Sequence, residues 1–104
     1  KVEDAEVHLR EALKLNDKLP SAHYYLGLVF FNEKAFAEAE KELELSISTG
    51  GDSLAIAHRI LGGLYMGSKK NEQAANELER YLKLEPKAPD AERIKGTIKQ
   101  LRGQ

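Results

Sequence analysis

Hydrophobic residues recur along three parts of the chain with the three- and four-residue spacing of an amphipathic helix. Most of the positions between them carry Glu, Asp, Lys or Arg. Each of these parts is therefore predicted to be a helix with one face in water. The apolar stripes are Ala5, Leu9, Ala12 and Leu13 in residues 2–15, Phe36, Ala39, Leu43 and Ile47 in residues 36–48, and Ala74, Ala75, Leu78, Tyr81 and Leu82 in residues 71–84.

Two other segments, residues 20–32 and 53–67, are apolar on nearly every side. A helix of this kind is buried on most sides, or buried on one side and adhesive on another. Pro20 suits a first helical turn, and Ser53 is expected to cap the later helix. The last segment, residues 90–102, is expected to be a closing helix with a polar outer side.

Helix-breaking residues separate these six segments, and none of the segments shows the strict alternation of a half-buried strand. The sequence therefore predicts an all-α protein. The breakers are Asn16-Asp17 with Pro20, Asn32-Glu33-Lys34, Gly50-Gly51, Gly67-Ser68, and Pro86 with Pro89.

The chain also repeats itself with a shift of 35 positions. A shift of about this size is typical of stacked helical repeats, in which no unit buries its apolar face alone. His23, Leu26, Gly27 and Phe30 recur as His58, Leu61, Gly62 and Tyr65, and Ala39 and Leu43 recur as Ala74 and Leu78.

These residues resemble the tetratricopeptide repeat: a large residue, then Leu-Gly, an aromatic residue, a later Ala, and a closing Pro. The family unit has about 34 residues, so the extra residue is expected in the turn from Gly50 to Ser53. The chain departs from the family pattern at five positions. His23 and His58 stand where the family prefers Trp, Ser46 and Tyr81 where it prefers Ala, and Gly51 where the second copy has Pro86.

The resemblance implies one domain over residues 1–104, folded as antiparallel helix-turn-helix repeats in a right-handed α-solenoid. Residues 1–19 would hold the second helix of an incomplete repeat, and residues 20–52 and 53–88 would be two full repeats. Residues 89–104 would form a C-terminal capping helix. The absent side chains of Gly27 and Gly62 would let the two helices of each repeat approach closely, opposite Ala39 and Ala74 in the facing helices.

Composition narrows the functional class. The chain is 41% hydrophobic and 32% charged, which is typical of a folded domain, and no apolar stretch reaches the roughly 18 residues of a membrane helix. Its net charge is −1, so it lacks the basic excess of a nucleic-acid-binding protein. The absence of cysteine slightly favours a reducing compartment such as the cytoplasm, but many exported proteins also lack cysteine, so export stays an alternative. Because the chain begins with Lys1, it is expected to be an excerpt or a processed product.

Candidate chemistry is sparse. No nucleophile, phosphate-loop or metal-ligand motif appears, so neither an enzymatic activity nor a cofactor is expected. His23 and His58 are interpreted as packing residues because they occupy equivalent repeat positions, and His8 is expected to be solvated.

A second stripe on the apolar helices gives the candidate site. In the family, this stripe lines a concave groove that grips peptides, and its residue types are common at protein interfaces. The alternative is that the stripe packs against the closing helix or against a helix upstream. The predicted groove consists of Tyr24, Leu28, Phe31, Asn32, Arg59, Gly63 and Met66, with Arg93 as a second cation; Gly63 and Gly67 would leave a depression beside Arg59.

The expected partner is a protein or peptide, held as an extended or helical apolar segment with one acidic residue. One family subtype clamps a C-terminal carboxylate with Lys and Asn side chains on the first helices of its repeats, and two of these side chains are Asn. Here the matching positions are Tyr24, Leu28 and Arg59, so that clamp is absent. The alternative function is a structural or self-association segment of a longer repeat array. The apolar face of residues 2–15, with Leu9 and Leu13 exposed, would then form a homodimer.

Overall fold

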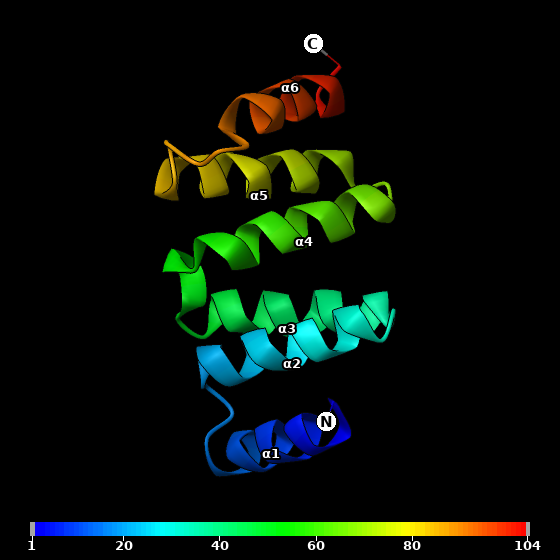
Figure 1. Cartoon of the computed structure of the whole chain (residues 1–104), viewed down its shortest axis with the longest axis vertical. Helices are drawn as coiled ribbons and strands as arrows, with labels where there is room; N and C mark the ends of the chain where they lie inside the picture. Colours follow the sequence, from blue (N-terminus) through cyan, green and yellow to red (C-terminus); the bar gives the residue numbers. More distant parts are fainter. Residues whose placement is uncertain (1, 104) are drawn as a thin grey trace. The chain divides into compact units, whose positions relative to one another are not determined.

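The computed structural model describes residues 2–103, with side chains from Glu6 onward, and every α-helix in this range lies close to a predicted segment (Figure 1). The all-α prediction is therefore confirmed, while Ala5 lies outside the described side chains. The elements are α1 (Val2–Leu15), α2 (Pro20–Asn32), α3 (Phe36–Ser48), the short 3₁₀ helix η1 (Gly51–Ser53), α4 (Ala55–Gly67), α5 (Asn71–Leu84) and α6 (Ala91–Leu101).

The helices pack in antiparallel pairs, α2 with α3 and α4 with α5 (Figure 1). The chain divides into two compact units, one ending at Ser53 and the other beginning at Leu54. In the first unit α1 packs on α2, and in the second α6 packs on α5. Within residues 2–103, every helix is too short or too polar to serve as a membrane span.

The glycine of each Leu-Gly pair brings two helices together, as predicted. A Cβ atom on Gly27 would lie 3.0 Å from Leu43 Cγ, and one on Gly62 would lie 2.8 Å from Leu78 Cδ2. Ala39 and Ala74 are fully buried on the facing helices, with backbone oxygens 3.5 Å from the same two Cβ positions. The leucines therefore fill the space that the glycines leave, and the alanines let the backbones approach.

His23 and His58 are buried, at 5% and 2% exposure, which confirms their interpretation as core residues. They are also polar links. Nδ1 of His23 lies 2.8 Å from Oε1 of Glu42, and Nε2 lies 2.7 Å from the carbonyl oxygen of Asp17. In the second unit, Nδ1 of His58 lies 2.6 Å from Oε1 of Glu77. Each full repeat thus joins its two helices through the same His–Glu pair. His8, by contrast, is 81% exposed, as expected.

Two departures from the family pattern are accommodated by hydrogen bonds. Ser46, where the family prefers Ala, is fully buried and donates to the carbonyl oxygen of Pro20 at 2.7 Å. Tyr81, the other such position, donates to Oδ1 of Asp90 at 2.8 Å. A buried hydroxyl needs a partner of this kind, since an unpaired one is costly.

The expectation that Ser53 caps the later helix is wrong. Ser53 ends η1, and α4 begins at Ala55 with Leu54 at the cap position and no side-chain capping bond. The chain turns here through Gly50, whose φ of 127° is open to glycine but strained for other residues. Because the 3₁₀ turn occupies Gly51–Ser53, the cap position falls on Leu54, one residue later than the sequence suggested.

The closing helix α6 joins the core of the second unit through Ile94 and Ile98, which pack with Leu78 and Tyr81. Gly96 lies in open space, so α6 takes the register that the two isoleucines define. Arg102 then ties the end of α6 to α5.

Three groups on α5 receive the Arg102 guanidinium. Nη1 lies 2.7 Å from Oε2 of Glu79, Nη2 donates to Oδ1 of Asn76 at 2.6 Å, and Nε lies 3.3 Å from Glu72. The hydrogen bond from Arg102 lowers the pKa of Glu79 below its ordinary value. The polar outer side expected for the last helix is present, since Glu92, Lys95 and Lys99 are exposed.

Lysines occupy the left-handed positions that end α2 and α4. Lys34 has a φ of 63° and Lys69 a φ of 61°. In each turn the amide of the following residue bonds a carbonyl in the last turn of the helix, from Ala35 to Phe30 and from Lys70 to Tyr65, both at 2.8 Å. This is the Schellman arrangement, in which glycine is preferred because it has no Cβ to strain the backbone.

We therefore expect Lys69→Gly to raise the free energy of unfolding by about 1 kcal/mol, since a left-handed non-glycine residue costs about that much. Urea unfolding monitored by circular dichroism measures the change. Lys41→Gly, inside α3, is the matched control and should lower stability by about 1 kcal/mol. Equal losses in both variants would show that the strain at Lys69 contributes nothing.

Candidate functional site

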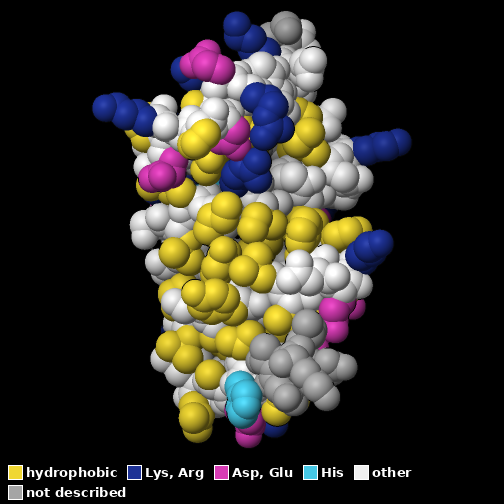
Figure 2. All heavy atoms as spheres, in the orientation of Figure 1, with side chains coloured by type: hydrophobic (Ala, Val, Ile, Leu, Met, Phe, Trp, Pro, Cys, Tyr) yellow, Lys and Arg dark blue, Asp and Glu magenta, His cyan; other side chains and the backbone are white. Residues whose placement is uncertain are grey.

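The predicted groove residues of the first unit lie along α2. Tyr24 and Leu28 are half-buried, whereas Phe31 is 39% exposed and Asn32 is exposed at the end of the helix. Hydrophobic side chains gather over α2 in Figure 2. Burial, with a smaller contribution from the neighbouring Tyr25, raises the pKa of Tyr24, so its hydroxyl stays protonated near neutral pH.

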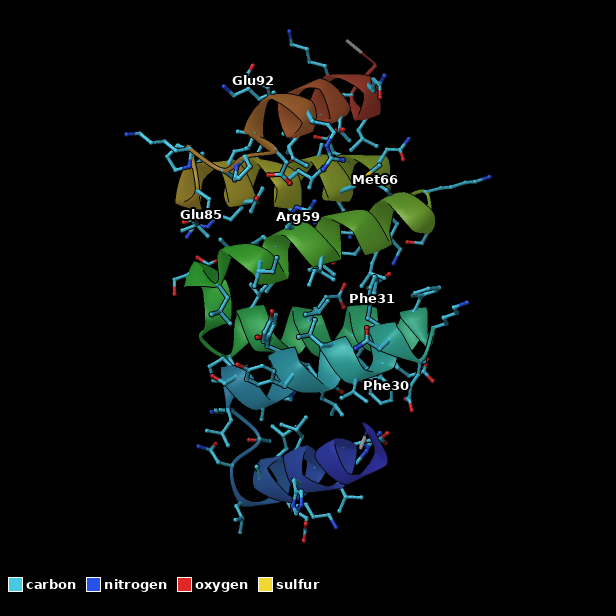
Figure 3. The ribbon with its side chains drawn as sticks, in the orientation of Figure 1. Phe30, Phe31, Arg59, Met66, Glu85 and Glu92 are labelled. Atoms are coloured by element: carbon cyan, nitrogen blue, oxygen red, sulfur yellow. The ribbon has the colours of Figure 1, made fainter. Side chains whose placement is uncertain are left out.

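Phe30 and Phe31 leave α2 on different sides (Figure 3). Cζ of Arg10 on α1 lies 5.4 Å from the centroid of the Phe30 ring, over its face. Phe30 is therefore part of the packing between α1 and α2. The Phe31 ring makes an edge contact with Phe36, with centroids 5.7 Å apart. Phe31 therefore belongs to an accessible aromatic surface, since Phe36 is itself 49% exposed.

The predicted residues of the second unit begin on α4, where Arg59, Gly63 and Met66 follow one face. A Cβ atom on Gly63 would meet nothing within 4 Å, and Met66 is 41% exposed. The sequence predicted a depression at Gly63 with Arg59 beside it, and a pocket of about 170 Å³ lies there. Gly67, also expected to shape it, is not among the lining residues. These are Arg59, Gly63, Met66, Leu78, Arg93, Ile94 and Thr97.

Asp90 organises the charges beside this pocket. Its Oδ2 accepts a hydrogen bond from Nε of Arg59 at 2.7 Å, and its Oδ1 accepts one from the Tyr81 hydroxyl at 2.8 Å. Nη2 of Arg93 lies 3.7 Å from the same Oδ2. The hydrogen bond from Arg59, followed by that from Tyr81, lowers the pKa of Asp90 below its ordinary 3.8. The same pair raises the pKa of Arg59, which stays charged.

The role of Asp90 was not predicted from the sequence. An Asp directly before a helix usually caps it, and Asp90 does stand at the cap position of α6. Its carboxylate makes no capping bond and faces Arg59 and Tyr81 instead. Tyr81 could have indicated this role. It places a hydroxyl at a repeat position where the family prefers Ala, and a buried hydroxyl needs a hydrogen-bond partner.

The Asp90 contacts predict a loss of stability in acid. A carboxylate whose pKa is lower in the folded state stabilises the fold above its unfolded pKa, and this contribution disappears as the pH falls through the folded value. We therefore expect thermal unfolding to shift to lower temperature below about pH 3.8. Asp90→Asn should unfold at a lower temperature than the wild type at pH 7, and the two melting curves should converge in acid. A constant difference at every pH would contradict this assignment.

The eight predicted site residues thus fall into two groups, one in each unit. The first group follows α2, and all four members of the second line the pocket. The groups are Tyr24, Leu28, Phe31 and Asn32, and Arg59, Gly63, Met66 and Arg93. Among residues 2–103, no cluster of three or more His, Asp or Glu side chains is placed to hold a metal ion.

A sequence model for the tetratricopeptide repeat matches residues 1–52, half of the chain. The chain belongs to the tetratricopeptide repeat family. The recurring Leu-Gly, aromatic and alanine positions had already indicated this family, and the antiparallel helix pairs agree with it. Among curated protein sequences, none matches this chain.

Solved structures share the fold at low sequence identity. The first tetratricopeptide repeat domain of Spaghetti (RPAP3), bound to the HSP90 peptide SRMEEVD, is 24% identical with a TM-score of 0.83, over 100% of this chain and 82% of that one. The MamA crystal structure is 22% identical with a TM-score of 0.82, over 98% of this chain and 59% of that one. The Arabidopsis OM64 tetratricopeptide domain is 19% identical with a TM-score of 0.79, over 95% and 81%.

Proposed function

We propose that this chain binds a peptide or an extended segment of a partner protein. The binding surface would be the second apolar stripe of α2 and of α4, the first helix of each helix pair, together with Arg93 of α6. Tetratricopeptide repeat domains are protein-interaction domains and are typically non-catalytic. In the first unit the proposed binding residues are Tyr24, Leu28, Phe31 and Asn32 on α2. In the second unit they are Arg59, Gly63 and Met66 on α4, together with Arg93 on α6.

The observation that carries this proposal is the accessibility of apolar side chains on helices whose other faces are buried. Phe31 is 39% exposed and Met66 is 41% exposed, although each belongs to a helix that is packed into its unit through another face. A solvent-exposed aromatic or methionine side chain adds little to the core. Such side chains are enriched where proteins bind partners.

The chemistry of the stripe favours a mainly apolar partner segment with an acidic residue. One structural relative, the Spaghetti domain, is bound to an HSP90 peptide that contains acidic residues. This chain has Tyr24, Leu28 and Arg59 where one family subtype has its carboxylate-clamping residues, so we propose a different ligand. Aromatic and aliphatic contacts would supply most of the affinity. The positive charge of Arg59 and Arg93 would favour an acidic residue, and Arg93 would contact it, since Arg59 already donates to Asp90.

Selection of peptides from a random display library on the wild-type chain tests the proposal. We expect enriched peptides with apolar residues at helical or alternating spacing, and weaker binding by Tyr24→Ala/Phe31→Ala by about 100-fold, since two aromatic contacts of about 1–2 kcal/mol each are removed. Circular dichroism should show unchanged helicity in this variant. Equal loss of helicity and binding, or no enrichment on the wild-type chain, would contradict the proposal.

A second candidate function is self-association through α1, because Leu15 is 90% exposed and Val7 is 54% exposed. The residues first expected to mediate it, Leu9 and Leu13, are half-buried. A dimer would therefore use Val7 and Leu15 instead. Light scattering across micromolar concentrations should detect a dimer that Leu15→Lys abolishes. A strict monomer over this range would exclude self-association.

A further inference from the structure

The pocket of the second unit has an apolar floor. Leu78 and Ile94 are buried core residues, and Gly63 adds no side chain. Its volume of about 170 Å³ is well below that of a pocket for a drug-sized ligand and close to that of a cavity that holds benzene. The space therefore fits one medium-sized apolar side chain.

The rim of the pocket carries an excess of positive charge. Arg59 and Arg93 both line it, and the carboxylate of Asp90 lies beside both guanidinium groups. Nε of Arg59 lies 2.7 Å from Oδ2 of Asp90 and forms a close ion pair with it. Nη2 of Arg93 lies 3.7 Å from the same oxygen, and the Arg93 side chain is 70% exposed. Arg93 can therefore turn toward an incoming anion at little cost to the fold.

We propose that this pocket receives a leucine-sized aliphatic side chain of the partner segment, and that an adjacent acidic side chain of the same segment pairs with Arg93. This inference rests on the proposed function and specifies the chemistry of the ligand at one place. The apolar floor selects the aliphatic group, since its burial removes apolar surface from water. The charge excess at the rim selects Asp or Glu beside it.

The methyl group of Met66 can report ligand binding to the pocket by NMR. Met66 lines the pocket and is the one methionine of the 104-residue chain, so ¹³C-methyl methionine labelling gives a single NMR signal at the site. The probes are N-acetyl-Leu-Glu-amide, its uncharged isostere N-acetyl-Leu-Gln-amide, and N-acetyl-Ala-Glu-amide, which lacks the aliphatic side chain. Titration of each into the full chain measures its dissociation constant.

We expect a saturable shift with N-acetyl-Leu-Glu-amide and affinity about three- to fivefold weaker for the Gln isostere, as for the loss of an exposed ion pair. The Ala probe should bind weakest. Arg93→Gln should abolish the preference for Glu over Gln. Absence of any shift with N-acetyl-Leu-Glu-amide at millimolar concentration, or equal affinity for all three probes, would overturn the proposal.

Gly63→Leu and Gly67→Leu form a matched pair on α4. A Cβ atom at either position meets nothing within 4 Å, so both variants are expected to fold, but only Gly63 lines the pocket. The introduced leucine side chain would occupy the pocket in the first variant alone. We therefore expect Gly63→Leu to abolish the probe-induced shift and Gly67→Leu to retain it. Retention of binding by Gly63→Leu would place the probe elsewhere and overturn the proposal.

The dipeptide titrations and the display-peptide affinities test the pocket and the α2 surface separately. Tyr24→Ala/Phe31→Ala should bind N-acetyl-Leu-Glu-amide as the wild type does, since both substitutions lie on α2 of the other unit. If display peptides lose affinity for the Tyr24→Ala/Phe31→Ala variant but the dipeptides do not bind, the pocket proposal is rejected and the α2 binding surface is kept. Dipeptides that bind the pocket, together with display peptides indifferent to Tyr24 and Phe31, would reject the α2 surface and keep the pocket.

Discussion

Replacing His23 with leucine is expected to lower the free energy of unfolding by about 3 kcal/mol, although leucine is the more hydrophobic residue. The imidazole is 5% exposed and bonds two oxygens, one from Glu42 at 2.8 Å and one from Asp17 at 2.7 Å. Leucine would leave both oxygens without this partner, and the Glu42 side chain is only 15% exposed. An unpaired buried acceptor costs about 1–3 kcal/mol, and more when it is charged.

Urea unfolding of His23→Leu and His8→Leu measures this effect. His8 is 81% exposed, so His8→Leu should change stability by less than about 0.5 kcal/mol. Glu42→Leu should lose about as much as His23→Leu, and the double variant should lose less than the sum, since the pair is then removed together. A His23→Leu variant as stable as the wild type would show that the pair does not hold α2 and α3 together.

Gly62→Val should lower the free energy of unfolding by about 2–3 kcal/mol, while Gly63→Val, one residue along the same helix, should change it little. A Cβ atom on Gly62 would lie 2.8 Å from Leu78 Cδ2, and the two methyl groups of valine have no room between α4 and α5. Overpacking of this kind typically costs about 1–3 kcal/mol. A Cβ atom on Gly63 would meet nothing within 4 Å, so only helix propensity changes, by a few tenths of a kcal/mol.

The comparison uses the same substitution at neighbouring positions, so its intrinsic effect on the helix cancels. Leu78→Ala in the Gly62→Val background provides a further check. Removal of the leucine branch should recover part of the stability that Gly62→Val loses, whereas Leu78→Ala alone should cost about 2–4 kcal/mol through the cavity it opens. Equal stability of Gly62→Val and Gly63→Val would contradict the close helix approach.

The helices could be predicted from the sequence because local signals agree with the global repeat. Apolar spacing set their faces, and breakers such as Asn16-Asp17 set their ends. The start of α4 could not be predicted in the same way. Ser53 has good capping chemistry, but the preceding turn winds into η1 and the helix begins after it. A competing local conformation of this kind depends on the φ of Gly50, which a sequence pattern does not specify.

The candidate site was predictable to the extent that it depends on helical register. Arg59, Gly63 and Met66 are spaced by four and three residues, so they share one face of any regular helix. The partners of Arg59 were not predictable, because its bond to Asp90 joins α4 to the start of α6 and arises only when the second unit packs. The His–Glu pairs were missed for the same reason, although Glu42 and Glu77 recur with the same shift as the histidines.

Binding of a partner segment through the Tyr24 face of α2 is tested most directly by the affinity of display-selected peptides for Tyr24→Ala compared with Tyr25→Ala. These neighbouring tyrosines have the same chemistry on the same helix, and Tyr25 is the more exposed at 54%, but only Tyr24 belongs to the proposed binding stripe. We predict that Tyr24→Ala weakens binding about tenfold and that Tyr25→Ala leaves it within about twofold of the wild type. Equal affinities of the two variants, or a larger loss for Tyr25→Ala, would contradict binding through this face of α2.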